Sequence, residues 1–477
     1  MKNKKNSLRS LSKDLLFSDI NSFWDKDILP ALVEYIKIPN KSPSFDKNWK
    51  INGHMNQVLD LATSWTEKNA PNNAIITTKE SPGRTPLLLI DIPGKKEGNV
   101  LMYGHLDKQP EMEGWREDLG PWVPVLENNK LYGRGGADDG YALFSCVAIL
   151  KALKNQKIDL PRILVLIEFS EESGSPDLPH YMDLCKSIIG NPDLVICLDS
   201  GAGDYKRFWT TTSLRGLIGC SLRVDVLDEG VHSGGASGYV PSSFRIIRQL
   251  LSRIESEETG EIQLQELHTK IPKHRIVEAE KLVRILGNEL VKEFPWSKKT
   301  NPSSENLVEG VLRRSWRPAL STIGARGIPK SGNAGNVLRP YTQLQLSIRI
   351  PPLVNHITAQ RAIQKALSSS PPYNSKISID FEEPASGWNA PKTDAWLLNA
   401  TNEASQAYFN EEACSLSEGG TIPFMAMLGE KFPNAQFVIT GVLGPGSNAH
   451  GPNEFLHIPY AKKITACIAH ILSCFQK

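Results

Sequence analysis

The sequence predicts an α/β fold made of a split domain and an inserted one. The split domain is expected to have a mostly parallel central sheet covered by helices on both faces, and the insert to be a smaller α+β domain. The first half of the chain alternates short apolar runs with helical patterns, which is typical of such sheets. This pattern changes after about residue 212 and returns near the end of the chain, which indicates an insertion.

Four apolar runs in the first half are expected to be strands. Two of them are bounded by Gly and Pro, and the other two are apolar on both faces, as in central strands of a covered sheet. The runs are residues 86–94, 99–105, 162–170 and 194–200. Apolar residues at helical spacing over 138–156 predict a helix, with Asp139 as its expected N-cap.

The middle of the chain is predicted to be the insert. Residues 217–228 alternate as a half-buried strand should, and a polar helical stretch covers 243–300. A strand at 343–352, a helix from Thr358 to about Leu367 and a strand at 375–384 follow. The predicted domain ranges are therefore 1–211 and 392–477 for the split catalytic domain, with 212–391 inserted.

The α/β pattern returns in the last part of the chain. It predicts a helix at 395–409, a strand at 435–444 and a final helix with Pro459 near its first turn. Apolar residues of the final helix form a single stripe, which indicates one buried face. The stripe comprises Ile464, Cys467, Ile468, Ile471, Leu472 and Phe475.

Length and composition limit the class of protein. A chain of 477 residues exceeds what one hydrophobic core usually supports, so two domains are expected. A net charge of +2 gives no electrostatic reason to expect nucleic acid or an anionic membrane as partner. The basic start lacks the apolar region of a signal peptide, and no run is long enough to span a membrane. Seven scattered cysteines without a C-x-x-C pair favour a reduced, cytoplasmic protein.

Residues able to carry chemistry follow the expected strands. His105 and Asp107 stand two positions apart at the end of the second run, and alternation along a strand directs such residues to the same side. Further acids and a histidine follow the other runs or lie in Gly-rich loops, namely Asp138, Asp139, Glu171, Glu172, Asp199 and His450. Ligand sites in open α/β sheets form at the carboxyl ends of the strands, so these side chains are expected to converge.

Each of these residues alone has a simpler interpretation. Glu171 and Glu172 fit a solvated turn, and His450 fits a surface loop. Together they predict a metal site, because carboxylates buried close together are costly unless cations neutralise them. Two imidazoles and three carboxylates suit two divalent ions, with one histidine on each ion and a carboxylate between them. Mixed nitrogen and oxygen ligation favours Zn²⁺, with Mn²⁺ or Co²⁺ as alternatives.

Five short motifs resemble the metal-site motifs of the M20 dinuclear zinc peptidases. The motifs are MYGHLD, LYGRGGADDG, EESGS, CLDSG and NAHGPNE. The overall length, the GW after the first motif and the LRG before the insert are most similar to the cytosolic nonspecific dipeptidase (carnosinase-like) branch. The resemblance covers nearly the whole chain.

The resemblance implies a role for each residue of the site. One metal ion would be bound by His105, Asp138 and Asp199, and the other by Asp138, Glu172 and His450. Asp107 would orient His105, as ligand histidines generally require. Glu171 would be the general base that takes a proton from a water between the two ions and delivers it to the leaving amine. A cis peptide bond between Asp138 and Asp139 is also implied.

The resemblance further implies that the insert is a lid and dimerisation domain. His232, in GVHSGG, would stabilise the oxyanion in the other subunit's site of a homodimer. Arg349 would hold the substrate's C-terminal carboxylate, and the alternative is a salt-bridged surface arginine. The family has a threonine where Asn336 stands, so this residue is a weaker candidate for substrate binding. The loop SEGGTIP matches the family's substrate-backbone loop and implicates Gly419, Gly420 and Thr421.

Three functions are consistent with these residues. Within M20, aspartate at the position of Asp199 is typical of dipeptidases and aminopeptidases, so hydrolysis of dipeptides or small peptides is the predicted activity. The alternative is an amidohydrolase of N-acyl amino acids on the same fold, which would not require a free α-amine on its substrate. A catalytically silent scaffold is the third, and the presence of Glu171 with a full ligand set argues against it.

Overall fold

The computed structural model describes residues 11–477, which form two compact units. Unit 1 comprises the chain up to Thr211 with Ala390–Leu416 and Met427–Lys477, and unit 2 comprises Thr212–Asn389 and Ser417–Ala426. The predicted ranges assigned 417–426 to the split domain, whereas this segment packs with unit 2. The first ten residues of the basic start, where no signal peptide is expected, lie outside the described residues.

Unit 1 is built on a six-stranded sheet in the order β1-β2-β6-β3-β7-β17. Its strands are β1 (Ile75–Lys79), β2 (Leu87–Ile92), β3 (Asn99–His105), β6 (Arg162–Glu168), β7 (Leu194–Cys197) and β17 (Gln436–Ile439). Strands β6, β3, β7 and β17 are parallel, and β1 and β2 form an antiparallel edge. The predicted mostly parallel sheet is confirmed. Strand β1 escapes prediction because it is short and only half-buried.

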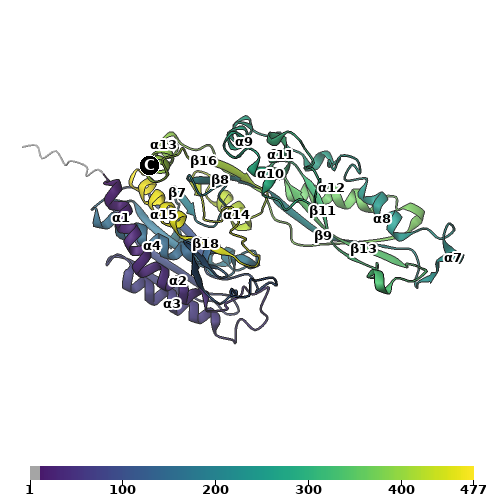
Figure 1. Ribbon diagram of the computed structural model, residues 1–477, viewed down its shortest axis with the longest axis horizontal. Helices are drawn as coiled ribbons and strands as arrows, with labels where there is room; N and C mark the ends of the chain where they lie inside the picture. The colour runs from purple at the N-terminus through teal and green to yellow at the C-terminus, as the bar shows by residue number, and fades with distance from the viewer. Residues whose placement is uncertain (1–10) are drawn as a thin grey trace, which may run out of the picture. The chain divides into compact units, whose positions relative to one another are not determined.

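The helices of unit 1 pack around this sheet (Figure 1). They are α1 (Lys13–Phe23), α2 (Leu29–Ile36), α3 (His54–Asn69), α4 (Tyr141–Asn155), α5 (Leu178–Leu184), α6 (Lys186–Ile189), α13 (Ala395–Phe409) and α15 (Ile458–Ser473). The predicted single stripe of α15 is too narrow, because α1, α4 and α13 pack around this helix and bury most of its circumference. The small side chains of Ala461, Ala466 and Ala469 allow this close packing.

A smaller sheet of unit 1 joins two distant parts of the sequence. Strand β18 (Phe455–His457) pairs with β5 (Lys130–Tyr132), which pairs with β4 (Val125–Glu127). The pairing is antiparallel, with Phe455 opposite Tyr132. The loop before β18 is therefore held beside the loop after β5, and both loops carry predicted metal ligands.

Unit 2 contains an antiparallel sheet in the order β11-β13-β9-β14. Its strands are β9 (Gly216–Asp225), β11 (Ala319–Arg326), β13 (Tyr341–Ile350) and β14 (Lys376–Phe381). Buried residues alternate along β13, and this face packs with α8 (Ser243–Leu251) and α12 (His356–Ser368) to form the core of unit 2. The predicted α+β insert is present. Strand β11 was not expected, because most of it is exposed and it lacks an apolar period.

The rest of unit 2 lies at the two ends of this sheet. Figure 1 shows α7 (Ser233–Ala236) at one end and α9 (Lys273–Leu286), α10 (Glu289–Lys292) and α11 (Leu307–Ser315) at the other. A two-stranded ribbon of β10 (Val231–His232) and β12 (Val337–Leu338) leads into α7. The chain passes between the units near β8 (Trp209–Leu214), β15 (Trp388–Asn389), β16 (Cys414–Glu418) and α14 (Pro423–Lys431).

The structure describes the cysteines and the length and hydropathy of the helices. The seven cysteines, all within residues 11–477, form no disulfide with one another, and six of them are buried. Among residues 11–477, no helix is both long and apolar enough to cross a membrane. The cytoplasmic location stays a prediction.

Candidate metal centre

The candidate ligands of unit 1 lie where elements of its sheets end. His105 is the last residue of β3, Asp199 follows β7 by two residues, and Glu172 lies in the turn directly after β6. Asp138 lies in the turn before α4, and His450 lies in the loop before β18. The strands β3, β6 and β7 are parallel and in register, with His105 opposite Glu168 and Tyr103 opposite Cys197. Their carboxyl ends therefore meet at one edge, as expected for a ligand site.

The first candidate metal group consists of His105, Asp138 and Asp199. The Nε2 atom of His105 lies 3.4 Å from Oδ1 of Asp138 and 3.7 Å from Oδ2 of Asp199. One ligand atom from each residue lies within 4.8 Å of the others. These separations suit three ligands of one ion.

The second candidate group consists of Asp138, Glu172 and His450, and it meets the same distance limit. The Nε2 atom of His450 lies 3.0 Å from Oδ2 of Asp138 and 3.2 Å from Oε2 of Glu172. The two groups thus share Asp138, which turns one carboxylate oxygen toward each histidine.

Hydrogen bonding and charge in the cluster fit a pair of cations. The Nε2 atom of the buried His105 lacks a hydrogen-bond partner, as does Oε1 of Glu172. Burial raises the pKa of Asp199 to about 7. Burial lowers the pKa of His450, but hydrogen bonds with Asp138 and Glu172 outweigh it and raise this pKa to about 11. The carboxylates therefore require positive charge among them, which metal ions would supply.

Asp107 contacts three parts of the site. Its Oδ1 lies 3.3 Å from Nδ1 of His105, on the ring edge opposite the ligand atom. Its two oxygens also accept hydrogen bonds from the backbone N–H groups of Glu171 (3.1 Å) and Glu172 (3.0 Å). The orienting contact to His105 was expected, whereas the two contacts to the turn after β6 were not. One carboxylate thus positions a candidate ligand and the candidate base together.

Glu171 lies beside the cluster without belonging to either group. Its Oε2 is 4.0 Å from Nε2 of His105. Burial, followed by the negative charge of Asp199, raises the pKa of Glu171 well above the usual value of a glutamate. A carboxyl that holds a proton strongly and binds no metal suits a residue that transfers protons.

Asp139 does not cap the helix that follows it, so this prediction is wrong. Helix α4 begins at Tyr141, and its N-cap is Gly140. The buried carboxylate of Asp139 instead accepts a hydrogen bond from the backbone N–H of His105 (3.3 Å). The peptide bond between Asp138 and Asp139 is cis, which confirms the implication of the resemblance.

Two supporting groups escaped the sequence analysis. The buried ion pair of Arg134 with Glu454 joins the loop after β5 to the loop that carries His450. Arg134 also donates to the carbonyl of Gly451 (2.8 Å), next to His450. Gln109 donates to Oε2 of Glu172 (2.6 Å). The signal for the ion pair was present, since Arg134 and Glu454 lie inside two of the five motifs, but sequence cannot show which charges pair.

The predicted residues of unit 2 lie in two separate places. His232 is the last residue of β10, and Asn336 directly precedes β12. The carbonyl of Asn336 accepts from the N–H of Ser233 (2.9 Å). Both His232 and Asn336 are exposed. The hydrogen bond of the His232 ring is local, from the N–H of Gly234 to Nδ1 (3.1 Å).

Arg349 lies at the other place, with the loop that contains Thr421. Its Nη1 donates to Oγ1 of Thr421 (2.7 Å), and that hydroxyl donates to the carbonyl of Arg215 (2.6 Å). Burial lowers the pKa of Arg349, and no carboxylate among residues 11–477 forms an ion pair with it. The interpretation as a salt-bridged surface arginine is therefore wrong. In the same loop, Gly419 accepts from Arg215 (3.2 Å) and Gly420 is exposed.

The sequence of residues 101–473 matches the family described as peptidase family M20/M25/M40. The chain belongs to this family. The resemblance carried by the five motifs is confirmed, and so is the prediction of an enzyme of the metallopeptidase class.

Several curated proteins are similar over most of the chain. The cysteinylglycine-S-conjugate dipeptidase of Corynebacterium striatum is 25% identical over 429 residues, which cover 85% of each chain. The human Beta-Ala-His dipeptidase is 25% identical over 379 residues, 77% of this chain and 73% of that protein. The matched regions cover most of this chain and most of each relative.

Solved structures share the fold. The dipeptidase Dug1p of Saccharomyces cerevisiae superimposes with a TM-score of 0.77 at 20% identity, covering 97% of this chain and 98% of Dug1p. Human carnosine dipeptidase 1 gives a TM-score of 0.76 at 19% identity, covering 98% and 99%. The predicted fold class is thereby confirmed.

Proposed function

We propose that this protein is a dipeptidase that hydrolyses the amide bond of dipeptides or small peptides with two divalent metal ions. The observation that carries the proposal is the position of Asp138, whose oxygens divide between a group with His105 and a group with His450. One imidazole and two carboxylates in each group favour Zn²⁺, with Mn²⁺ or Co²⁺ as alternatives. The dipeptide substrate is inferred from the names of the similar proteins.

The residues of unit 1 divide the chemistry among them. Ions held by the two groups would activate a water and polarise the scissile carbonyl. Glu171 takes the proton at Oε2 and later delivers it to the leaving amine, because it lies beside the ligands and retains a proton readily. Asp107 keeps Glu171 and His105 in a fixed relation to each other through the contacts described above.

Unit 2 supplies the groups that bind substrate. Arg349, with Thr421 beside it, offers an uncompensated guanidinium for the C-terminal carboxylate of a dipeptide. Gly419 and Gly420 belong to the same loop, and the absence of a side chain at the exposed Gly420 leaves its backbone accessible to a substrate. His232 and Asn336 act at the scissile amide rather than at the C-terminal carboxylate. There His232 stabilises the oxyanion that forms from the carbonyl.

The distances within unit 2 support our proposal of a homodimer. Arg349 and Tyr341 are eight positions apart on β13, or about 27 Å, and the ribbon with His232 continues from the Tyr341 end. A dipeptide spans only about 7 Å. One copy of unit 2 holds His232 and Arg349 too far apart for a single dipeptide, which supports a role of the histidine in the site of a second subunit. The edge strand β11, with Ile323 66% exposed, offers a surface for such a dimer.

The test combines metal analysis with a substrate panel. Purified protein reconstituted with Zn²⁺ should hold two ions per chain, and His450→Ala should hold one, because nothing nearby replaces the imidazole. Dipeptides with a free α-amine should be hydrolysed, and the matched N-acetyl amino acids should not. Preference for the N-acetyl compounds would favour the deacylase instead, and at most one ion per chain would contradict the dinuclear site.

A further inference from the structure

A pocket in unit 2 is separate from every residue assigned above to metal binding or catalysis. It encloses about 520 Å³ and is lined mainly by α10, α11 and the segments before and between them. This volume is in the range of sites that bind small organic molecules. All of its lining residues belong to unit 2.

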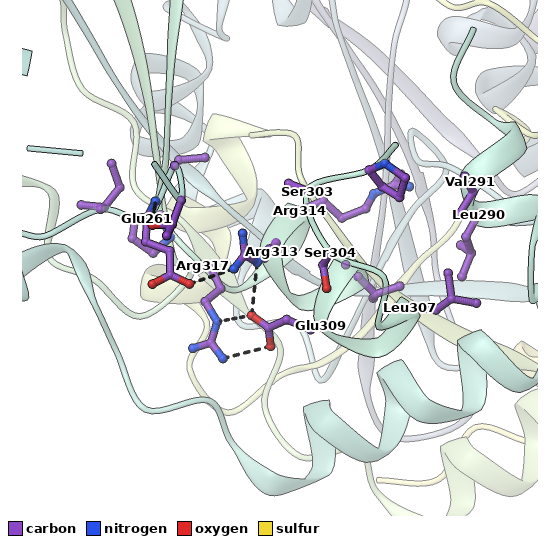
Figure 2. A pocket seen from close by; sticks show the side chains of 18 of the residues that line it. Glu261, Leu290, Val291, Ser303, Ser304, Leu307, Glu309, Arg313, Arg314 and Arg317 are labelled. Atoms are coloured by element: carbon purple, nitrogen blue, oxygen red, sulfur yellow. Dashed lines mark hydrogen bonds and ion pairs between the residues drawn. The ribbon is translucent and has the colours of Figure 1, made fainter. Parts of the chain in front are cut away.

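The two sides of the pocket differ in chemistry. Figure 2 shows Leu290, Val291 and Leu307 together on one side, and Arg313, Arg317 and other charged side chains on the opposite side. Phe294 and Trp296 add aromatic surface to the lining. A ligand that fills this space would need an apolar body and a polar or charged end.

Most of the pocket's arginines are already neutralised. Arg313 and Arg317 share the carboxylate of Glu309, as the dashed lines of Figure 2 show. Arg313 also pairs with Glu261 at 2.8 Å, and Arg314 pairs with Glu293 at 2.7 Å. These pairs leave little positive charge for a ligand.

Arg215 is the exception. This residue lines the pocket, and its guanidinium donates to the carbonyls of Gly419 and of two other lining residues, Arg313 and Arg317. The guanidinium forms no ion pair with any carboxylate of residues 11–477. Burial, followed by repulsion from Arg349 and Arg314, lowers the pKa of Arg215 to about 10. A half-buried cation without a counter-charge is costly, and a bound anion would remove that cost.

We propose that this pocket binds a small carboxylic acid with an apolar or aromatic body, whose carboxylate pairs with Arg215. The apolar side accepts the body of the ligand, and the planar guanidinium matches a carboxylate in bidentate geometry. The binding itself is independent of the proposed dipeptidase function.

Hydrogen bonds of Arg215 connect this pocket to the loop that contains Gly419 and Thr421. Nε of Arg215 donates to the carbonyl of Gly419, and the carbonyl of Arg215 accepts from the hydroxyl of Thr421, which also contacts Arg349. A carboxylate on Arg215 would draw the guanidinium away from Gly419. The ligand should therefore change KM for dipeptides, an effect that rests on the proposed function.

Gly310 provides matched variants for the test. It lines the pocket from α11, and a Cβ added there meets no atom within 4 Å. Gly310→Ala therefore leaves the pocket open, whereas Gly310→Phe places a ring in it. Neither change threatens the helix, because both residues are better helix formers than glycine.

The experiment is a calorimetric titration of the full-length protein with 4-phenylbutyrate and its neutral analogue 4-phenylbutanamide. Wild type and Gly310→Ala should bind the acid at one site, and the amide should bind roughly 10-fold more weakly, as expected for the loss of one charge-assisted contact. Gly310→Phe should weaken the binding of the acid by at least about 10-fold. In Arg215→Gln, acid and amide should bind alike.

Three results would overturn the site. They are equal binding of acid and amide to the wild type, undiminished binding of the acid to Gly310→Phe, and no saturable binding up to about 10 mM. Undiminished binding to Gly310→Phe would place the acid at the metal centre instead. If the acid binds as expected but leaves KM of Gly310→Ala unchanged, the route through Gly419 is wrong while the pocket stands.

Discussion

The candidate metal centre of unit 1 and the proposed oxyanion residue His232 of unit 2 are held in place to very different degrees. His105 and Asp107 are fully buried, and each carboxylate of the cluster contacts a histidine, a backbone N–H or both. His232 is exposed and bonds only within its own turn. The first region is held by contacts within unit 1, whereas His232 has no contact that fixes its ring beyond its own turn, as the proposed role in a second subunit's site would require.

This difference separates two kinds of variant. Changes in unit 1 should alter metal content or chemistry while the rest of the site keeps its geometry. Changes in unit 2 should leave the metals in place and alter binding or turnover. The predictions below use this separation.

Glu171→Gln should have the largest effect. Glutamine keeps the shape of the side chain but cannot accept the proton, so kcat should fall by roughly 10²–10⁴-fold. Metal content, measured by atomic emission, should stay near that of the wild type. The neighbouring Glu172→Gln is the control and should lower metal affinity, because Glu172 belongs to the group with His450. Equal metal contents in the two variants would contradict the division of roles.

His232→Ala should lower kcat by roughly 10²–10³-fold with both metal ions retained, because an oxyanion donor is lost. The crossing between subunits can be tested by mixing inactive Glu171→Gln with inactive His232→Ala. In a mixed dimer one site would inherit both defects and the other neither, so activity should return. If subunit exchange is demonstrated and no activity returns, His232 acts within its own chain.

Asp107→Asn should lower metal affinity by about 10–100-fold, the usual effect of losing the partner of a ligand histidine. Asparagine keeps the size of the side chain, but only its oxygen can accept a hydrogen bond. The backbone N–H of either Glu171 or Glu172 therefore loses its acceptor. Activity at saturating Zn²⁺ should therefore stay below that of the wild type. Full recovery at high Zn²⁺ would show that Asp107 acts on His105 alone.

Arg349→Met should raise KM for dipeptides by about 10–100-fold with a smaller change in kcat, since a charged contact to the substrate carboxylate is lost. Thr421→Val should have the smallest effect, about 5-fold on KM, because it removes only the hydroxyl that holds Arg349. Dipeptide amides, which lack the carboxylate, should be insensitive to both changes. A loss in kcat alone would contradict a binding role.

The strands and residue pattern of unit 1 could be predicted because burial leaves a simple signal. Strands such as β3 and β6 are apolar on both faces, and the residues with chemistry follow them directly. Asp139 could not be assigned from sequence, since an acid before a helix fits a cap as well as a contact to His105. The pairing of Arg134 with Glu454 was also hidden, because it depends on the alignment of β18 with β5 over more than 300 positions.

Less of unit 2 could be predicted. Strands β9 and β13 alternate clearly, but β11 is largely exposed and β10 and β12 are two residues long. The uncompensated charge of Arg215 has no signature in the sequence, since it is defined by the carboxylates that are missing around it. Its place beside Gly419 also explains why the segment 417–426 packs with unit 2.

The contact of Glu454 with Arg134 has a consequence for biosynthesis. His450 and Glu454 stand far downstream of His105, Asp138, Glu172 and Asp199, so a nascent chain carries four candidate ligands long before it carries the fifth. The second ion group cannot close until translation has passed Glu454 and β18 has paired with β5. A chain that ends before His450 therefore lacks one ligand of the second candidate ion group.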